Sequence, residues 1–483
     1  MLGHLIRKEI LDHLLSLRFL ILSGIGALII WLSLYDGYIY YQDRLEDYRL
    51  AQAATEQRIR QITASDGLVR EPWYELNCFG FHEHKPPTPM SIFVRGLDPT
   101  LGHSISNTNT RAQRLRRSPA EMEWFLGIFP PLDLGLVVQV VLSLFVLLLT
   151  YDAVCGEKEA GTLRLTASFS MPRHRLLIGK CLGVLIPTLA AFGLPFMIGI
   201  VVVLMTPEAQ ITGTEWTRLW VVLIAFGLYL VTFTCAGLLS SCLTHRSATS
   251  FVLLLTFWVG AVVVLPRLSL IAADGFRPAP SIHEYQARKN AVYKQYLVKW
   301  REVRKQWQQE HSQPGREWWR TPEGREANQF YYIKTRDEML RRQGQSELAH
   351  IDEDFRNRYN ARLSLSVTLA RLSPAFVLKN AVVRLTGTGI DRHQRFEGAF
   401  EVNNRERGVW EDKASDLSNL RWVYPEKYGK PRWDISDMPR FAYREVWPQE
   451  DLQAALIDVG VLVLWGVVFF AGAYLKMLRY DVR

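Results

Sequence analysis

The sequence predicts a mainly α-helical, polytopic membrane protein with six transmembrane helices and two extracytoplasmic polar domains, the larger one helical. Long apolar runs, each of the length that crosses a bilayer, alternate with highly charged segments. The 48% hydrophobic share is therefore an average over two unlike kinds of segment. The short polar segments are basic at one end of the predicted bundle only, which gives the chain an orientation.

Residues 1–18 are predicted to form an amphipathic helix at the inner membrane surface, because leucines and isoleucines share one helical stripe. A basic region before an apolar run is also typical of signal peptides. Here no small-residue cleavage site follows the run, so residues 19–38 are predicted to be a retained first span.

Residues 39–131 form the first predicted extracytoplasmic domain. Prolines between residues 85 and 99 break any helix repeatedly, which predicts a loop with a short strand. The next four spans are predicted at 132–150, 176–205, 219–243 and 251–272, and a loop at 151–175 separates the first two of them. The span at 176–205 contains Pro187 and Pro195, so we expect it to tilt, kink or break.

Residues 273–451 form the second predicted extracytoplasmic domain. Apolar residues from Val292 to Trp307 recur at spacings of three and four, which predicts a long amphipathic helix before a break at 313–315. A second helix is expected over 325–371, a turn at Gly387 and Gly389, and irregular structure from Asn403 onward. The last span is predicted at 452–475, with a tail at 476–483.

The charge of the short segments predicts which ends face the cytoplasm. Residues 1–18, the loop after the second span and the tail are basic, whereas the short turn at 206–216 contains acidic residues and no lysine or arginine. An even number of spans then places both termini and the loop inside, and both polar domains outside.

The loop at 151–175 is the segment best suited to bind a soluble partner. Leu163, Leu165, Phe169 and Met171 supply apolar surface, and charged residues surround them. This combination suits a helix that lies along the membrane against another protein. An ordinary solvated loop fits the periodicity equally well.

The motifs in this loop favour the first interpretation. Glu157-Lys158-Glu159, Gly161-Thr162-Leu163, Pro172-Arg173 and Gly179-Lys180 follow one another, and this order resembles the first cytoplasmic loop of permeases of the type 2 ATP-binding-cassette (ABC) exporters. Further segments resemble the subgroup with a large external domain of uncharacterised function: 240–250, 258–267, 371–380, 385–389, 437–441 and the terminal 479–483. The resemblance covers most of the chain. Residues 273–451 are an insertion relative to the simplest members, so no substrate follows from those members.

The resemblance implies that the loop carries a coupling helix, which sits in a cleft of a separate cytoplasmic ATPase. That role is expected for Glu157, Lys158, Glu159, Gly161, Thr162, Arg164, Pro172 and Arg173. The implied function is the permease subunit of an ATP-driven exporter in the bacterial inner membrane, with a second permease, identical or paralogous, and two ATPases. The chain itself is expected to bind no cofactor, since ATP and Mg²⁺ belong to the ATPase. Membrane lipids and a periplasmic protein are further expected partners.

Other chemistries find little support in the sequence. Residues 156–162 have the two-glycine spacing of a phosphate loop but lack its lysine. Cys78, His82 and His84 could bind copper or zinc, but no fourth ligand is identifiable, so ordinary surface residues are preferred and no metal site is predicted. No nucleophile elbow or zinc-protease helix is present, which disfavours a membrane hydrolase. The pI near 9.2 is not accompanied by a basic and aromatic surface for nucleic acid.

Two polar residues inside predicted spans are candidates for a transport path, Asp458 and Gln139. A carboxylate at the bilayer centre costs about 2.5–3.5 kcal/mol, which marks such residues as functional or paired. The structural alternative for Asp458 is an ion pair near the outer interface. The alternative for Gln139 is a hydrogen bond between helices.

Two alternative functions are also compatible with the sequence. A mechanical transmission complex would use ATP to move the external domain without moving a solute, and the size of 273–451 motivates it. A sensor or scaffold would have no energy source, and no ATPase would copurify with it. Transport by the reconstituted complex separates the exporter from both.

Overall fold

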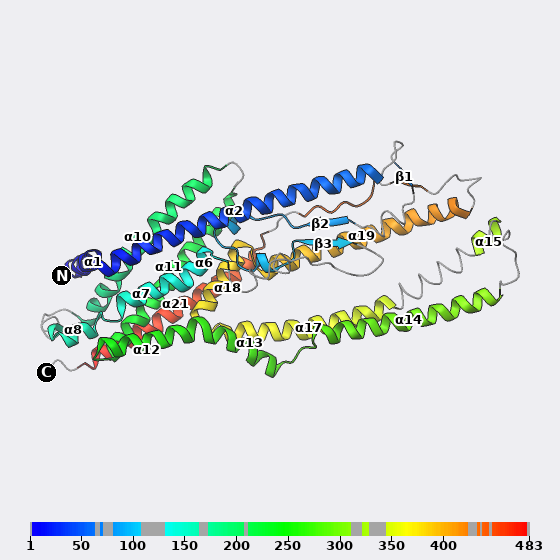
Figure 1. The fold of residues 1–483 in the computed structure, drawn as a ribbon. Helices are drawn as coiled ribbons and strands as arrows, with labels where there is room; N and C mark the ends of the chain where they lie inside the picture. The colour runs from blue at the N-terminus through cyan, green and yellow to red at the C-terminus, as the bar shows by residue number, and fades with distance from the viewer. Residues whose placement is uncertain are drawn as a thin grey trace.

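The computed structural model describes residues 2–62, 68–70, 81–107, 131–163, 172–206, 211–310, 321–327, 344–423, 432–434, 437–443 and 447–480. They form an elongated, mainly helical molecule (Figure 1). Six helices among these residues are long and apolar enough to cross a membrane, which confirms the predicted number. They run Leu17–Gln61, Leu134–Glu159, Arg173–Leu204, Gly213–Leu243, Ser247–Phe276 and Gln449–Leu478.

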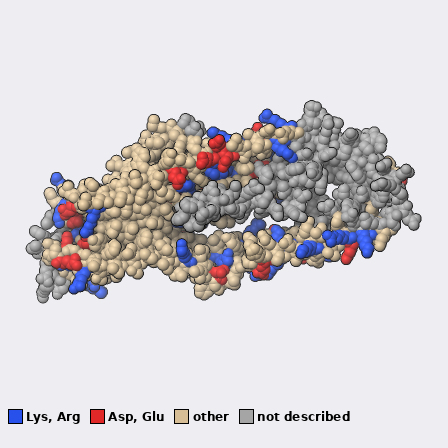
Figure 2. Space-filling view, viewed as in Figure 1, with Lys and Arg blue, Asp and Glu red and all other residues tan. Residues whose placement is uncertain are grey.

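Charged side chains gather in two places on the face that Figure 2 shows. One is the end of the molecule that holds the termini, and the other comprises the segments beyond the bundle. The band of surface between them is almost free of lysine, arginine, aspartate and glutamate. Such a band is the surface that the hydrocarbon layer of a membrane requires.

The chain begins with two helices that Ser16 separates, α1 (Leu2–Leu14) and α2 (Leu17–Ile62). The Ser16 hydroxyl donates to the His13 carbonyl (2.7 Å) and accepts from the Phe19 amide (3.2 Å), so it closes one helix and caps the next. Helix α2 has 46 residues and is therefore about 69 Å long. It extends well beyond a bilayer.

The second and fifth spans each contain a π-helical segment. The second consists of α6 (Leu134–Leu136), the π segment η3 (Val137–Leu142) and α7 (Ser143–Thr150). The fifth consists of α12 (Ser247–Val259), the π segment η4 (Gly260–Val264) and α13 (Leu265–Phe276). A π turn shifts the backbone ladder and is frequent at functional sites. Side chains from other helices bond to a carbonyl in each segment, Tyr229 to that of Gln139 (2.9 Å) and Ser373 to that of Ala261.

The third span, α10 (Arg173–Leu204), is one helix that continues through Pro187 and Pro195. The sequence leaves tilt, kink and break open for this span, and the structure excludes the break. At its first half α10 carries Gly179 and Gly183, on which α1 lies. A Cβ atom at Gly183 would be 2.4 Å from the Cβ of Glu9, so the absence of a side chain permits this close crossing.

Helix α11 (Gly213–Leu243) is the centre of the bundle and packs against α7, α10, α12, α18 (Pro374–Thr386) and α21 (Gln449–Leu478). It begins with a capping box of Thr212 and Glu215. Gly237 lets Thr150 of α7 approach its backbone, because a Cβ there would lie 1.9 Å from the Thr150 hydroxyl oxygen. The largest hydrophobic core of the described residues is built around this helix.

The first polar region contains short strands and 3₁₀ turns. Strand β2 (Phe81–His84) pairs antiparallel with β3 (Ser104–Asn107), and β1 (Leu68–Arg70) pairs antiparallel with β4 (Arg432–Asp434). The predicted strand inside 85–99 is wrong: that segment forms the turns η1 (Pro89–Ile92) and η2 (Asp98–Thr100). Proline at the start of each turn fixes the backbone there and removes a donor that a strand would need.

A buried polar network holds this region against α2. The ammonium of Lys85 lies 2.6 Å from the carboxylate of Asp98, which also accepts from the hydroxyl of Tyr40 (2.9 Å). His103 Nε2 lies 2.9 Å from the Asp98 carbonyl. Burial lowers the pKa of His103 to about 4, so its imidazole is neutral at pH 7. The Lys85 ammonium instead holds the pKa of the buried Asp98 below its usual range.

The described part of the second polar region is mainly helical. Helices α14 (Ile282–Glu310) and α17 (Gly344–Ala370) lie side by side as an arm that projects away from the termini (Figure 1), with α15 (Pro322–Ala327) beyond them. Helix α18 then turns back into the bundle and ends at Gly387, whose φ of +66° is a left-handed cap. This confirms the predicted turn.

The prediction of irregular structure from Asn403 onward is wrong for residues 403–423, because α19 runs without a break from Ile390 to Val423, whereas residues 437–443 contain no helix or strand. The hydrophobic residues of α19 follow no clear helical period. Phe396 and Phe400 contact Phe441 and Ile105 in a small separate core. Further along, Trp410 donates to Asp437 (2.9 Å). Tertiary contacts therefore stabilise a helix that periodicity does not reveal.

Candidate functional site

The candidate site is the short helix α8 (Cys155–Glu159), which lies with both termini at one end of the molecule (Figure 1). A turn at 151–154 separates it from α7. The amides of Val154 and Cys155 both donate to the hydroxyl oxygen of Ser241 (2.9 Å each), and this anchors the first turn of α8 on α11. The three charged residues that follow each contact a different part of the bundle.

Glu157 pairs with α10. Its Oε1 lies 2.7 Å from the Nζ of Lys180, which also lies 3.3 Å from a carboxylate oxygen of Glu9 on α1. The Lys180 side chain is 3% exposed, so its charge needs these two partners. One buried ammonium therefore joins α8, α10 and α1.

Lys158 binds the carboxyl end of α11. Its Nζ donates to the carbonyls of Ser241 (3.3 Å), Cys242 (2.7 Å) and Thr244 (2.8 Å). The last carbonyls of a helix have no partner within the helix, and a cation there also interacts favourably with the helix dipole. The same ammonium lies 5.4 Å from the ring centre of Tyr480.

Glu159 binds the amino end of α12. Its carboxylate accepts from the backbone amide of Ser247 (3.0 Å) and from the Ser247 hydroxyl (2.6 Å). An acceptor at this position caps the first turn of the helix, and its negative charge complements the dipole. Glu157, Lys158 and Glu159 thus connect α8 to α10, α11 and α12 in turn.

Arg173 ties the start of α10 to the end of the chain. Its guanidinium donates to the carbonyls of Met477, Leu478 (2.7 Å) and Tyr480 (3.1 Å), at the carboxyl end of α21. Pro172 precedes it at the helix N-cap and is exposed. Lys158 and Glu159 near the start of the predicted loop, and Arg173 at its end, therefore all bond to the ends of other helices.

The part of the loop that faces outward is short. Gly161, with φ of +71°, and Thr162 are exposed, whereas Leu163 is fully buried in the main core. Arg164, Leu165, Phe169 and Met171 lie outside the described residues. Sequence reasoning missed Glu9, Lys180, Ser241 and Ser247 as members of this site. Two signals pointed to the last three of these: the segment 240–250, which contains both serines, and the Gly179-Lys180 motif, because a lysine among apolar residues of a span requires a partner.

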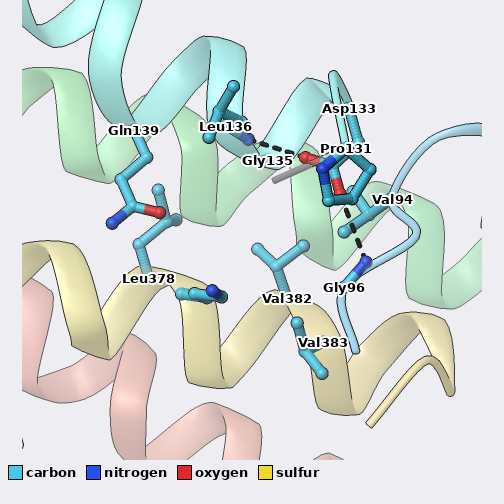
Figure 3. Close-up of a pocket in the computed structure, with 11 residues that line it drawn as sticks. Val94, Gly96, Pro131, Asp133, Gly135, Leu136, Gln139, Leu378, Val382 and Val383 are labelled. Carbon is cyan, nitrogen blue, oxygen red and sulfur yellow. Dashed lines mark hydrogen bonds between the residues drawn. The ribbon is translucent and has the colours of Figure 1, made fainter. Parts of the chain in front are cut away.

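The two transport-path candidates are in different surroundings. Asp458 is fully buried, and its oxygens accept from Arg371 Nε (2.8 Å) and Asn380 Nδ2 (2.7 Å). Gln139 lines a small pocket between η3 and α18, with Asp133, Leu378 and Val382 among the other lining residues (Figure 3). Asp458 does not line that pocket. The structure does not bring the two residues into one site.

The residues weighed as a metal site are described only in part. Cys78 lies outside the described residues, as does the side chain of His82. Among the side chains that the structure does describe, no three histidine, cysteine or acidic residues form a cluster that could hold a metal ion.

Comparison with known proteins gives two family matches. Residues 4–310 match the family described as "ABC-2 family transporter protein", and residues 282–458 match a domain of unknown function, DUF3526. The chain is also similar to a protein of Pseudomonas aeruginosa described as "Probable ABC transporter permease protein NosY". The similarity is 44% identity over 57 residues, which is 11% of this chain and 21% of that protein. The aligned part thus spans about a fifth of the relative's length.

Proposed function

Since the first of these matches covers well over half of the chain, the protein belongs to the ABC-2 family of transporter permeases, and we propose that it is the permease subunit of an ATP-driven exporter. It is a multi-pass membrane protein and a non-catalytic subunit, and its family implies an ATPase partner. In the proposal, that ATPase docks on α8 and the exposed turn at Gly161 and Thr162. ATP and Mg²⁺ are bound by the ATPase.

The observation that carries the proposal is the connection of α8 to the bundle. Three consecutive charged residues contact α10, α11 and α12, and Lys180 adds α1. A force applied to α8 would therefore reach α10, α11 and α12 directly, and α1 through Lys180. Closure of the ATPases on ATP would then shift the spans between two arrangements, driven by different ATP affinities of the two states.

The proposed topology places both termini and α8 in the cytoplasm, in a bacterial inner membrane, and the regions 39–131 and 273–451 outside. It is supported by the basic character of the short segments and by the common position of α8 and the termini at one end (Figure 1). The proposed assembly contains two permease copies, or a permease and its paralogue, with two ATPases. Lipids and a periplasmic protein complete the proposed partners.

Labelling and crosslinking test the docking site and the topology together. Cys78→Ser removes the cysteine that lies outside the described residues, and the four described cysteines are buried. In this background, a membrane-impermeant maleimide should label Glu353→Cys on α17 in spheroplasts, but Thr162→Cys only after permeabilisation. Thr162→Cys should also crosslink to the coexpressed ATPase. Labelling of both positions from the same side would overturn the proposal.

A mechanical transmission complex is the second candidate, because the α14–α17 arm projects far from the bundle (Figure 1). In that case ATP would rearrange the external region and a periplasmic partner without solute flux. Reconstitution of the complex with its ATPase separates the two functions. Flux of any solute supports the exporter, whereas ATP-dependent movement outside without flux supports mechanical transmission.

A further inference from the structure

The α14–α17 arm is held together as one unit. Its two helices are joined by an aromatic stack, an ion pair and a hydrogen bond, between Tyr285 and Phe355 (4.4 Å between ring centroids), Lys289 and Asp352 (2.8 Å), and Tyr296 and Glu347 (3.0 Å). Helix α17 also packs along α13, where Arg362 pairs with Asp274 (2.9 Å). Since α13 continues the fifth span, the arm and the outer end of that span form one body.

The base of the arm is bonded to the fifth span at its π segment. Ser373 stands between α17 and α18, accepts from the amide of Phe376 (3.1 Å) as the N-cap, and donates to the carbonyl of Ala261 in η4. A π segment offers such a carbonyl because its backbone ladder is out of register. The residue at which the arm turns into the bundle is therefore fixed to a deformable turn of a span.

The same base is bonded to the sixth span through Asp458. This carboxylate is fully buried and accepts from Arg371, the residue that follows α17, and from Asn380 on α18. A buried carboxylate without a partner is strongly disfavoured, so Arg371 and Asp458 must move together. Helix α18 packs on both α11 and α21, and this packing holds the base of the arm beside the sixth span.

From these contacts we propose that Arg371, Ser373 and Asp458 form a joint through which the fifth and sixth spans move the arm when the ATPase closes. The proposal rests on the proposed function, since the spans must respond to ATP. Beyond that function, it identifies the α14–α17 arm as the part that moves and the joint as the place where the arm is attached to the spans. The position of the arm on the far side of the membrane would then depend on whether the ATPase has bound ATP. A periplasmic protein that responds to this position would bind α14 or α17.

Pulsed electron–electron distance measurements between spin labels test the joint in the complete complex with its ATPase. In the Cys78→Ser background, labels at Thr217→Cys and Glu353→Cys report the distance from the bundle to the arm. Labels at Asp47→Cys on α2 and Glu450→Cys report the distance from the outer part of α2 to the start of the sixth span. Each pair is measured without nucleotide and with ATP trapped in the ATPase by vanadate.

In the otherwise unchanged protein, both distances should shift on trapping. In the double variant Arg371→Met with Asp458→Leu, no charge is left unpaired, so the fold is retained. The distance to the sixth span should shift as before, whereas the shift of the arm should become smaller, because only its attachment to the fifth span remains. The joint would be overturned if the arm of the double variant shifted as much as that of the unchanged protein. It would also be overturned if, in the unchanged protein, the sixth span shifted and the arm did not. If neither distance shifts and the ATPase does not bind, the proposed function fails and the joint with it.

Discussion

The Nζ of Lys180 lies 2.7 Å from the Oε1 of Glu157, and this pair connects the proposed docking helix to the third span. Lys180→Met should lower the stability of the detergent-solubilised protein, because it leaves the half-buried carboxylates of Glu9 and Glu157 without the buried ammonium that they share. Removal of one partner from a buried ion pair costs about 3–5 kcal/mol. The change is measured as the unfolding midpoint by tryptophan fluorescence.

Lys180→Arg is the matched control for this prediction, since it keeps the charge and the donors. It should retain most of the stability and of the ATP hydrolysis by the complex. Equal stability of the Met variant and the native protein would show that the pair contributes nothing.

Glu159→Lys should uncouple ATP hydrolysis from movement of the spans while membrane insertion stays intact. The lysine cannot accept from the amide and hydroxyl of Ser247, and its charge opposes the positive end of the α12 dipole. The measurement is solute flux or span movement per ATP hydrolysed in the reconstituted complex. Glu159→Gln keeps an acceptor oxygen and should stay coupled; a coupled Lys variant would contradict the capping role.

Gly161→Val should weaken binding of the ATPase, whereas Gly161→Asn should not. The φ of +71° is left-handed and costs about 1–2 kcal/mol for an ordinary residue, but asparagine tolerates it. Among the described residues, no atom outside its chain neighbours lies within 4 Å of a Cβ built there, so the asparagine meets no clash within the permease itself. Copurification of the ATPase with each variant measures the difference, and equal yields would argue against a role for this turn.

Gly183→Leu should detach α1 from α10, because even a Cβ atom would lie 2.4 Å from the Cβ of Glu9. Detachment should raise the rate at which trypsin cleaves after Arg7 and Lys8. Gly193→Leu on the same helix is the control, since no atom lies within 4 Å of its Cβ position. Identical cleavage rates in both variants would show that α1 does not depend on this crossing.

The half-buried carboxyl of Glu83 on β2 and the buried imidazole of His103 just before β3 should give opposite dependences of stability on pH. Burial raises the pKa of Glu83 to about 7, so its contribution to stability is present below the unfolded value of 4.5 and is lost as the pH rises through 7. Burial lowers the pKa of His103 to about 4, so stability is lost as the pH falls from 6.5 to 4. Each shift corresponds to about 3 kcal/mol.

The two contributions nearly cancel between pH 6.5 and 5, and single variants should separate them. Relative to the native protein, Glu83→Gln should lose stability on acidification across this window, and His103→Asn should gain it. Unfolding midpoints at pH 6.5 and 5 provide the measurement. Parallel changes in both variants would contradict the opposite signs.

The features of this protein that depend on local sequence could be predicted, and those that depend on distant contacts could not. Six spans follow from apolar runs, and the turn at Gly387 follows from glycine chemistry. The helix from Ile390 to Val423 could not be foreseen, because Phe441 and Asp437, which pack against it, come later in the chain.

The candidate site divides in the same way. The motif of Glu157, Lys158 and Glu159 identified the segment. The sequence alone does not reveal that these three side chains bond to other helices of the same protein rather than to the ATPase. Their partners Lys180, Ser241 and Ser247 are between 23 and 88 residues away. Asp458 was weighed as an ion pair or as part of a path, and only the fold identifies Arg371 as its partner. Its role in transport stays a prediction.

The hold of Arg173 on the carbonyls of Leu478 and Tyr480 has a practical consequence for anyone who purifies this protein. A tag fused after residue 483 would be separated by only three residues from Tyr480, whose ring lies beside Lys158 of α8. A bulky C-terminal tag would therefore compete for the space that the ATPase is proposed to occupy. Complexes should be isolated through a tag on the ATPase, or through a short epitope inserted far from this end.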